Sequence, residues 1–222
     1  MKGTDVIGHV DILESTRYPQ TLITVAAKGC RVNNPTAASE AENGEWVVNK
    51  LLQGDRGHYG PLEHPTISFK CEGFSHSLMQ QARTHRFLTF DVRSFRAPLK
   101  TTDSQELGDL FYLPEAYHKP EFRGLVEVAL EESLETWKIL VAGGMKPEDA
   151  RFILPGYALR QNFVVSGNLR AWWHFLDMRL KGDAQAEIRQ FSEQVDHLLG
   201  YWVPELQAYY REKRGKRARL SP

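Results

Sequence analysis

Hydrophobic positions recur along this chain with several periods, and the longest regular run has the spacing of a helix. Val126, Leu130, Leu134, Trp137 and Val141 follow one another at intervals of three or four residues. Side chains at that spacing lie on one face of an α-helix. The pattern therefore predicts an amphipathic helix in this region, with one face buried.

Two more helices are predicted in the last third of the chain. One begins after Asn168, and the other runs from Ala184 to about Arg211. Pro204 should break the second helix, because proline lacks the N–H group that continues the helical hydrogen bonds. The basic run from about residue 212 predicts a flexible, solvated tail, with an anion-binding arm as the alternative.

The first hundred residues mix helical and extended patterns. Residues 36–52 predict a helix with Thr36 as its N-cap and Gly54 beyond its end, and residues 76–86 predict another. Extended or irregular chain is predicted for three segments, residues 6–13, 66–71 and 90–99. Strands and helices do not alternate regularly, so the whole pattern predicts a single mixed α/β domain over residues 1–222.

The charge balance narrows the function classes. Lys plus Arg and Asp plus Glu are both 28, giving a formal net charge of zero, whereas a duplex-binding protein usually carries a basic surplus.

Apolar runs are too short for a membrane span, and the first residues are too polar for a secretory signal. Cys30 and Cys71 are predicted to be buried thiols, and neither they nor the histidines have metal-ligand spacing. A cytoplasmic protein without a nucleic-acid, membrane or metal partner is expected.

Arginine is concentrated between Gln80 and Pro98. Four of these residues fall within a window of fourteen positions: Arg83, Arg86, Arg93 and Arg96. A guanidinium group can bind phosphate oxygens at two points, so the cluster predicts an anion pocket. The alternative is a charged surface segment paired with neighbouring carboxylates.

The arrangement of this cluster resembles a known signature. His85 and Arg86, seven intervening residues, Ser94 and then Arg96 resemble the Arg-His-Arg, seven-residue, Ser motif of the flavin-dependent thymidylate synthases, which a further arginine follows. Three other blocks resemble blocks of that family in the same order: HYGPLEH (58–64), ARFILP (150–155) and NLRAWWHFLDMR (168–179). The resemblance extends from about His58 to Arg189.

The resemblance implies a fold, an activity and a set of contacts. The family's fold is a small β-sheet flanked by long helices, and its activity is the reductive C5 methylation of dUMP to dTMP. FAD is the implied cofactor, with NADPH and 5,10-methylenetetrahydrofolate as co-substrates in a homotetramer with shared active sites. The positions that match FAD contacts are His58, Gly60, Thr84, His85, Arg86, Asn168, Arg170 and His174. The positions that match nucleotide contacts are Gln81, Arg83, Ser94, Phe95, Arg96, Arg179 and, from a neighbouring chain, Arg151.

Two of these positions are assigned to the reaction itself. Uracil C5 becomes a better nucleophile when negative charge builds on the ring, and a fixed guanidinium at Arg179 would stabilise that charge. Ser94 is assigned to hydrogen bonding of the substrate, because no adjacent histidine–carboxylate pair is evident to activate it as a nucleophile.

Departures from the family's pattern leave the substrate open. Thr84 stands where an arginine is common, Gly60 replaces Ser or Thr, Asp91 replaces Asn, and Ala97 replaces Tyr. Flavin-dependent modification of UMP or dCMP is one alternative. A non-catalytic nucleotide- or RNA-binding protein is the other.

Overall fold

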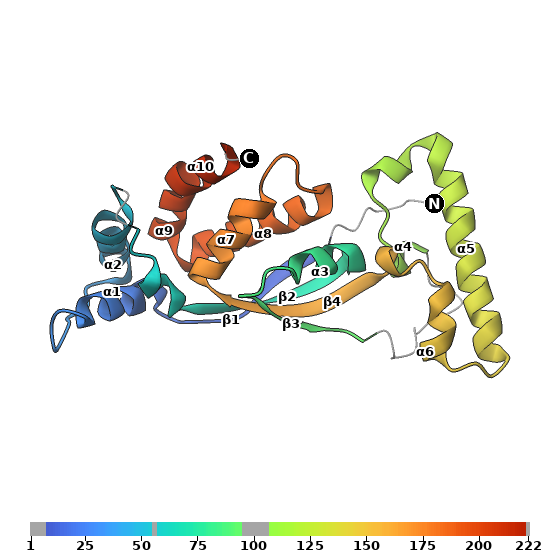
Figure 1. The fold of residues 1–222 in the computed structure, drawn as a ribbon, viewed down its shortest axis with the longest axis horizontal. Coiled ribbons are helices and arrows are strands. Elements are labelled where there is room, and N and C mark those ends of the chain that lie inside the picture. The colour runs from blue at the N-terminus through green and yellow to red at the C-terminus, as the bar shows by residue number, and fades with distance from the viewer. Residues whose placement is uncertain (1–7, 55–56, 95–106, 221–222) are drawn as a thin grey trace. The chain divides into compact units, whose positions relative to one another are not determined.

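A four-stranded antiparallel sheet runs through the computed structural model, which describes residues 8–54, 57–94 and 107–220 (Figure 1). Its strands are β1 (His9–Ser15), β2 (Thr66–Ser75), β3 (Thr89–Val92) and β4 (Arg160–Asn168), in the spatial order β1-β2-β4-β3. The mixed α/β class predicted from the sequence is confirmed.

Helices form most of the other regular structure in the described ranges. They are α1 (Pro19–Gly29), α2 (Glu40–Val47), α3 (His76–Ala82), α4 (Leu107–Leu110), α5 (Pro120–Ala142), α6 (Pro147–Ala150), α7 (Leu169–Arg179), α8 (Ala186–Trp202), α9 (Pro204–Tyr209) and α10 (Gly215–Leu220). Two π-helical segments, Val48–Leu52 and Tyr210–Arg214, follow α2 and α9. Among these described helices, none combines the length and the apolar composition that a bilayer crossing requires.

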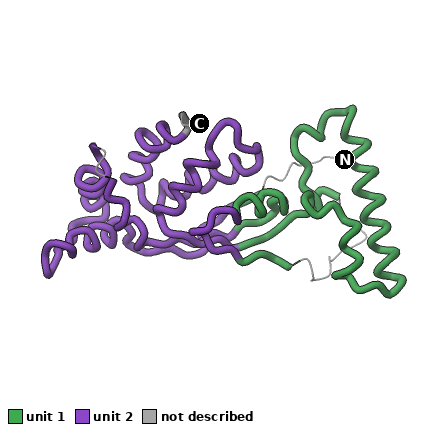
Figure 2. The backbone as a smooth tube through the Cα atoms, in the orientation of Figure 1, with its two compact units in different colours: residues 1–9, 71–82, 91–163 green, residues 10–70, 83–90, 164–222 purple. Residues whose placement is uncertain are grey.

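The chain divides into two compact units, coloured separately in Figure 2. Unit 1 comprises residues 1–9, 71–82 and 91–163, and unit 2 comprises residues 10–70, 83–90 and 164–222. Strands β2 and β4 each contribute residues to both units. The assignment of the whole chain to one domain, with a flexible tail from about residue 212, stays a prediction.

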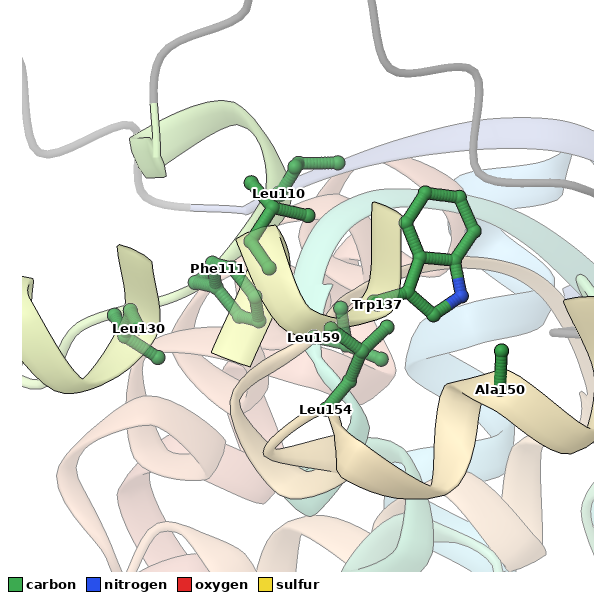
Figure 3. Close-up of a cluster of buried hydrophobic side chains, with 8 residues drawn as sticks. Leu110, Phe111, Leu130, Trp137, Ala150, Leu154 and Leu159 are labelled. Carbon is green, nitrogen blue, oxygen red and sulfur yellow. The ribbon is translucent and has the colours of Figure 1, made fainter. Parts of the chain in front are cut away.

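The core of unit 1 forms around helix α5. Leu130, Leu134 and Trp137 of this helix are buried, as their helical spacing predicts. They belong to a cluster with side chains from α4, α6 and the segment before β4, namely Leu110, Phe111, Ala150, Leu154 and Leu159 (Figure 3). Burying a leucine-sized side chain contributes about 1.5–3 kcal/mol, so this apolar face explains why the helix forms.

The core of unit 2 is aromatic and lies between helices α7 and α8 and its part of the sheet. Phe69 of β2 meets Trp172 of α7 edge to face, with ring centroids 5.0 Å apart. Phe175 meets Phe191 of α8 in the same manner at 5.7 Å. Trp173 and Phe175 are fully buried and belong to this core. These aromatic contacts fix the side of α7 that packs on the core, and its remaining side faces outward.

Two predicted helix ends are wrong. Helix α3 ends at Ala82 and not at Arg86. Helix α2 begins at Glu40 and not near Thr36, because Ser39 caps it and forms a reciprocal capping box with Glu42. Helix α1 and strand β4 were not predicted. The break at Pro204 is confirmed, since α8 ends at Trp202 and α9 begins at the proline.

The two cysteines lie in different surroundings. Both are free thiols; Cys71 is buried, as predicted. Cys30 is exposed, so the prediction that both thiols are buried is wrong for Cys30. It lies at the C-terminal end of α1 and donates a weak hydrogen bond to the carbonyl of Ala26.

Candidate active site

A tight turn in unit 2 presents the central part of the arginine motif. The Leu88 N–H donates to the His85 carbonyl over 3.0 Å, and the Leu88 side chain is buried. Thr84, Arg86 and Phe87 are exposed around this anchor. Gly167 makes the anchoring possible, because a Cβ atom at that position would collide with the Leu88 side chain. The turn is therefore held by packing beneath it and leaves its polar side chains outward.

Helix α7 supplies the second wall of the site. Its N-cap is Asn168, whose side-chain oxygen accepts from the Ala171 N–H over 2.9 Å. Asn168 was predicted to contact FAD, and its side chain has this capping role in the structure. Ala171, His174 and Met178 lie three and four residues apart along the outward side of the helix, and Arg179 adjoins them.

The turn and the helix enclose a cavity of about 330 Å³ in unit 2, a volume at the lower end for small-molecule pockets. The residues that line it are Thr84, His85, Arg86, Phe87, Leu88, Ala171, His174, Met178 and Arg179. Two of the nine are arginines, two are histidines and none is acidic. The electrostatic character of this described lining therefore favours an anionic or electron-rich ligand.

Arg179 and the turn are joined by direct hydrogen bonds. The Arg179 Nε donates to His85 Nε2 over 3.0 Å, and an Arg179 Nη donates to the Thr84 hydroxyl over 3.2 Å. Burial lowers the pKa of Arg179 from its ordinary value. The two acceptors orient the guanidinium group without bringing negative charge to it.

His85 is neutral near pH 7 in this arrangement. Burial, followed by the positive charge of Arg179 and an electrostatic contribution from His174, lowers its pKa to about 4. Since its Nε2 accepts the hydrogen bond from Arg179, the proton of the neutral ring is assigned to Nδ1. The ring stands edge to face on Phe175, with centroids 4.7 Å apart. His85 is thus a fixed, uncharged acceptor beside the cavity.

The departure at Thr84 has a local consequence. Where the family often carries an arginine, this chain has a hydroxyl that accepts from Arg179. A second arginine at this position would instead place a like charge next to the Arg179 guanidinium. Thr84 therefore suits the conformation that Arg179 adopts here.

The glycine- and proline-rich loop forms a 3₁₀ turn over Gly60–Glu63. His58 and Gly60 are both exposed. Glu63 forms an ion pair with Arg170 of α7 at 2.6 Å, with each side chain about half exposed. Such exposed pairs contribute about 0–1 kcal/mol. Arg170, predicted to contact FAD, is held by Glu63 near the first turn of α7.

The other predicted nucleotide contacts lie elsewhere in the chain. Gln81, near the end of α3, and Arg151, at the start of a 3₁₀ turn, are partly buried in unit 1, and Ser94 is exposed just after β3. Arg83 is exposed in unit 2 and does not line the cavity. Phe95 and Arg96 lie outside the described residues, as does Ala97. The grouping of these residues around one nucleotide stays a prediction.

The sequence reasoning missed four lining residues, namely Phe87, Leu88, Ala171 and Met178. A signal for two of them was present, because Ala171 and Met178 flank His174 at helical spacing. The other two, Phe87 and Leu88, follow Arg86 in the chain. His174 itself is exposed beside the cavity and is not a packed core residue.

Comparisons with known proteins show the family of this chain. The family described as "Thymidylate synthase complementing protein" matches residues 11–205. A flavin-dependent thymidylate synthase of Haloarcula marismortui is 34% identical over 96% of this chain and 99% of its own length. One from Pyrococcus abyssi is 36% identical over 83% of this chain and 75% of its own. The chain belongs to the thymidylate synthase complementing protein family, that of the flavin-dependent thymidylate synthases.

Proposed function

We propose that this protein catalyses the reductive C5 methylation of dUMP to dTMP, with 5,10-methylenetetrahydrofolate as carbon donor, FAD as cofactor and NADPH as reductant. The observation that carries the proposal is the cavity of unit 2. It brings Arg86 and Arg179, 93 positions apart in the chain, to one pocket with two histidines. The near-full-length similarity to relatives named flavin-dependent thymidylate synthase supports it.

The cavity residues fit a flavin nucleotide. The exposed guanidinium of Arg86 is suited to a phosphate of FAD, because it offers several donors in one plane. Thr84, His85 and His174 add hydrogen-bonding groups along the same pocket. We assign His58, Gly60, Asn168 and Arg170 to further FAD contacts. When bound, the flavin supplies hydride chemistry for the reduction of the one-carbon unit.

We assign Arg179 to the pyrimidine ring. Negative charge that builds on the ring when C5 is activated as a nucleophile would be stabilised by a guanidinium that is already oriented and partly desolvated. Neutral His85 and the Thr84 hydroxyl supply that orientation. The positive charge of Arg179 is then directed toward the substrate, and no reorganisation is needed as the reaction proceeds.

The remaining nucleotide contacts follow from the sequence motif. Ser94 is proposed to hydrogen-bond the substrate. Gln81, Arg83, Phe95, Arg96 and Arg151 are proposed to bind the rest of the nucleotide, with Arg151 coming from a neighbouring subunit. Phosphate binding remote from C5 orients the ring for reaction. This arrangement requires the homotetramer that we propose, which light scattering on the purified protein would test. A cytoplasmic location is part of the same proposal.

The direct test is spectroscopic and chemical. The purified protein should show a flavin absorbance spectrum, and it should release tritium from C5-labelled dUMP only when methylenetetrahydrofolate and NADPH are both present. Parallel assays with UMP and dCMP separate the related pyrimidine activities. A protein that binds no flavin and whose nucleotide affinity falls steeply with salt would instead be a non-catalytic nucleotide- or RNA-binding protein.

A further inference from the structure

Arg214, in the C-terminal segment, is buried more deeply than the charged residues on either side of it, Lys213 and Lys216. Its side chain is 22% exposed, against 43% for Arg211. Both its Nε and an Nη donate to one carboxylate oxygen of Asp177 on α7, over 3.1 and 2.7 Å. The family match ends at residue 205, so Arg214 lies beyond the matched region, whereas Asp177 lies within it.

The Arg214 guanidinium also lies against two aromatic rings. Its central carbon is 4.8 Å from the ring centroid of Tyr59 and 5.8 Å from that of Trp173. Tyr59 belongs to the loop between His58 and Gly60, whereas Trp173 belongs to α7. One side chain of the C-terminal segment therefore contacts both the loop and the helix that carry the proposed flavin contacts.

The electrostatics favour a fixed position for this group. Burial opposes the charged form of Arg214, but the hydrogen bond and charge of Asp177, with a smaller contribution from Tyr59, raise its pKa above the ordinary value. Partly buried ion pairs contribute little net stability, because desolvation offsets their attraction. What such a pair does provide is a defined geometry between the elements that it joins.

The geometry of α7 shows how this contact relates to the cavity. Trp173 and Asp177 are four residues apart and share one side of the helix, while His174 and Met178 share the side that lines the cavity. Asp177 and Arg179 are two positions apart and so point in different directions. Arg214 thus holds α7 from behind, without entering the pocket.

Other contacts fix the C-terminal segment independently of Arg214. The Tyr209 hydroxyl donates to the Leu52 carbonyl over 2.8 Å, and Trp173 Nε1 donates to the Gln207 side chain over 2.9 Å. Tyr210 is buried, with its ring centroid 5.4 Å from that of Trp173. Removing the Arg214 side chain should therefore leave the C-terminal segment folded, but it should loosen the contact between the loop of Tyr59 and helix α7.

We propose that Arg214 is a positioning residue that fixes the His58–Gly60 loop against the rear of helix α7, so that both present their flavin contacts together. This role rests on the proposed function, because the flavin site is what it serves. Arg214 itself does not touch the reacting atoms.

The test compares Arg214→Gln with Arg211→Gln, since Arg211 also pairs with an aspartate, Asp196, at 2.9 Å but contacts neither the loop nor the cavity. We expect the FAD dissociation constant of Arg214→Gln to rise about ten-fold, as is usual when the support of a binding group is lost. At saturating FAD, kcat should return close to the wild-type value. Arg214→Lys should recover part of the affinity, because it keeps a cation beside Asp177 but loses the planar stacking. Arg211→Gln should bind FAD as the wild type does.

A measurement without flavin complements this comparison. Hydrogen exchange of the apoprotein should be faster at residues 57–64 in Arg214→Gln, and unchanged there in Arg211→Gln. If Arg214→Gln fails to fold, the same measurements on Arg214→Lys test the positioning role. Suppose that the wild-type protein binds FAD and that the Arg214 variant matches it in both FAD affinity and hydrogen exchange of the loop. That result would overturn the positioning role and leave the proposed function standing. Wild-type protein that binds no FAD would overturn the proposed function and this role with it.

Discussion

Helix α7 meets one guanidinium group on each of two sides, and the two groups are held in opposite ways. Beside the cavity, its own Arg179 is bonded to a neutral histidine and a hydroxyl, and burial lowers its pKa. On the rear side, Arg214 is bonded to a carboxylate, and despite burial its pKa is raised. The comparison shows that the hydrogen-bond partners of a guanidinium group determine its role. Neutral acceptors orient the positive charge and leave it able to interact with a ligand. A carboxylate and aromatic rings instead neutralise and enclose it, so that the group serves to hold elements of the fold together.

The largest expected effect follows from removing the cavity-side guanidinium. Arg179→Ala should lower kcat for tritium release about 10²–10³-fold, the usual cost of losing one preorganised donor at a developing charge. The flavin absorbance per subunit should stay close to that of the wild type. Steady-state kinetics with C5-tritiated dUMP measure the first quantity, and a spectrum measures the second.

Removing the rear-side carboxylate should affect stability first. Asp177→Ala leaves the Arg214 charge partly buried beside Tyr59 and Trp173, so the free energy of unfolding should fall by about 2–3 kcal/mol. Urea denaturation measures this loss. Glu127→Ala is the matched control, because its ion pair with Arg123, which is more exposed than that of Arg214 with Asp177, should contribute less than about 1 kcal/mol. Equal losses in the two variants would mean that the rear-side pair is no more than a surface contact.

A smaller effect is expected from the packing beneath the turn. In Gly167→Ala the new methyl group collides with Leu88, and the adjustment should cost about 1–2 kcal/mol. Because Leu88 anchors the turn, the affinity for FAD should fall as well. Gly182→Ala is the control, since a Cβ atom there meets nothing within 4 Å. FAD affinity that is equal in both variants would show that the turn does not depend on this anchor.

An effect of similar size, which appears only on acidification, concerns pH. The pKa of His85 is about 4 in the folded protein against 6.5 ordinarily, so between these values the unfolded chain binds a proton that the folded chain does not. The free energy of unfolding should therefore fall as pH decreases from about 6.5 to 4. After allowance for the partial exposure of the ring, the loss is about 1–2 kcal/mol. His85→Gln should flatten this dependence in urea titrations at several pH values, and an unaltered slope would contradict the neutral-histidine assignment.

Local patterns predicted the elements whose causes are local. The buried face of α5 and the break at Pro204 follow directly from residue spacing and proline chemistry. The motif at His85 and Arg86 marked residues that line the cavity, but the turn itself was not predicted, because residues 76–86 were expected to be helical throughout. The signal for the true start of α2 was also local, because Glu42 follows Ser39 at capping-box spacing.

Features that depend on distant residues were not predictable in this way. Strand β4 was missed because its buried positions, Gln161, Phe163 and Val165, begin with a polar residue that interrupts the hydrophobic alternation. The basic run gave no indication that Arg214 would meet an aspartate 37 positions earlier. Nor could spacing show that Thr84 accepts a hydrogen bond from Arg179.

The most direct test of the central claim measures C5 tritium release by Arg179→Ala and Arg214→Gln side by side, with both enzymes saturated with FAD. If the cavity-side guanidinium acts on the substrate and the rear-side one only positions the flavin site, Arg214→Gln should release tritium near the wild-type rate, and Arg179→Ala should scarcely release any. Wild-type turnover by flavin-saturated Arg179→Ala would contradict the account.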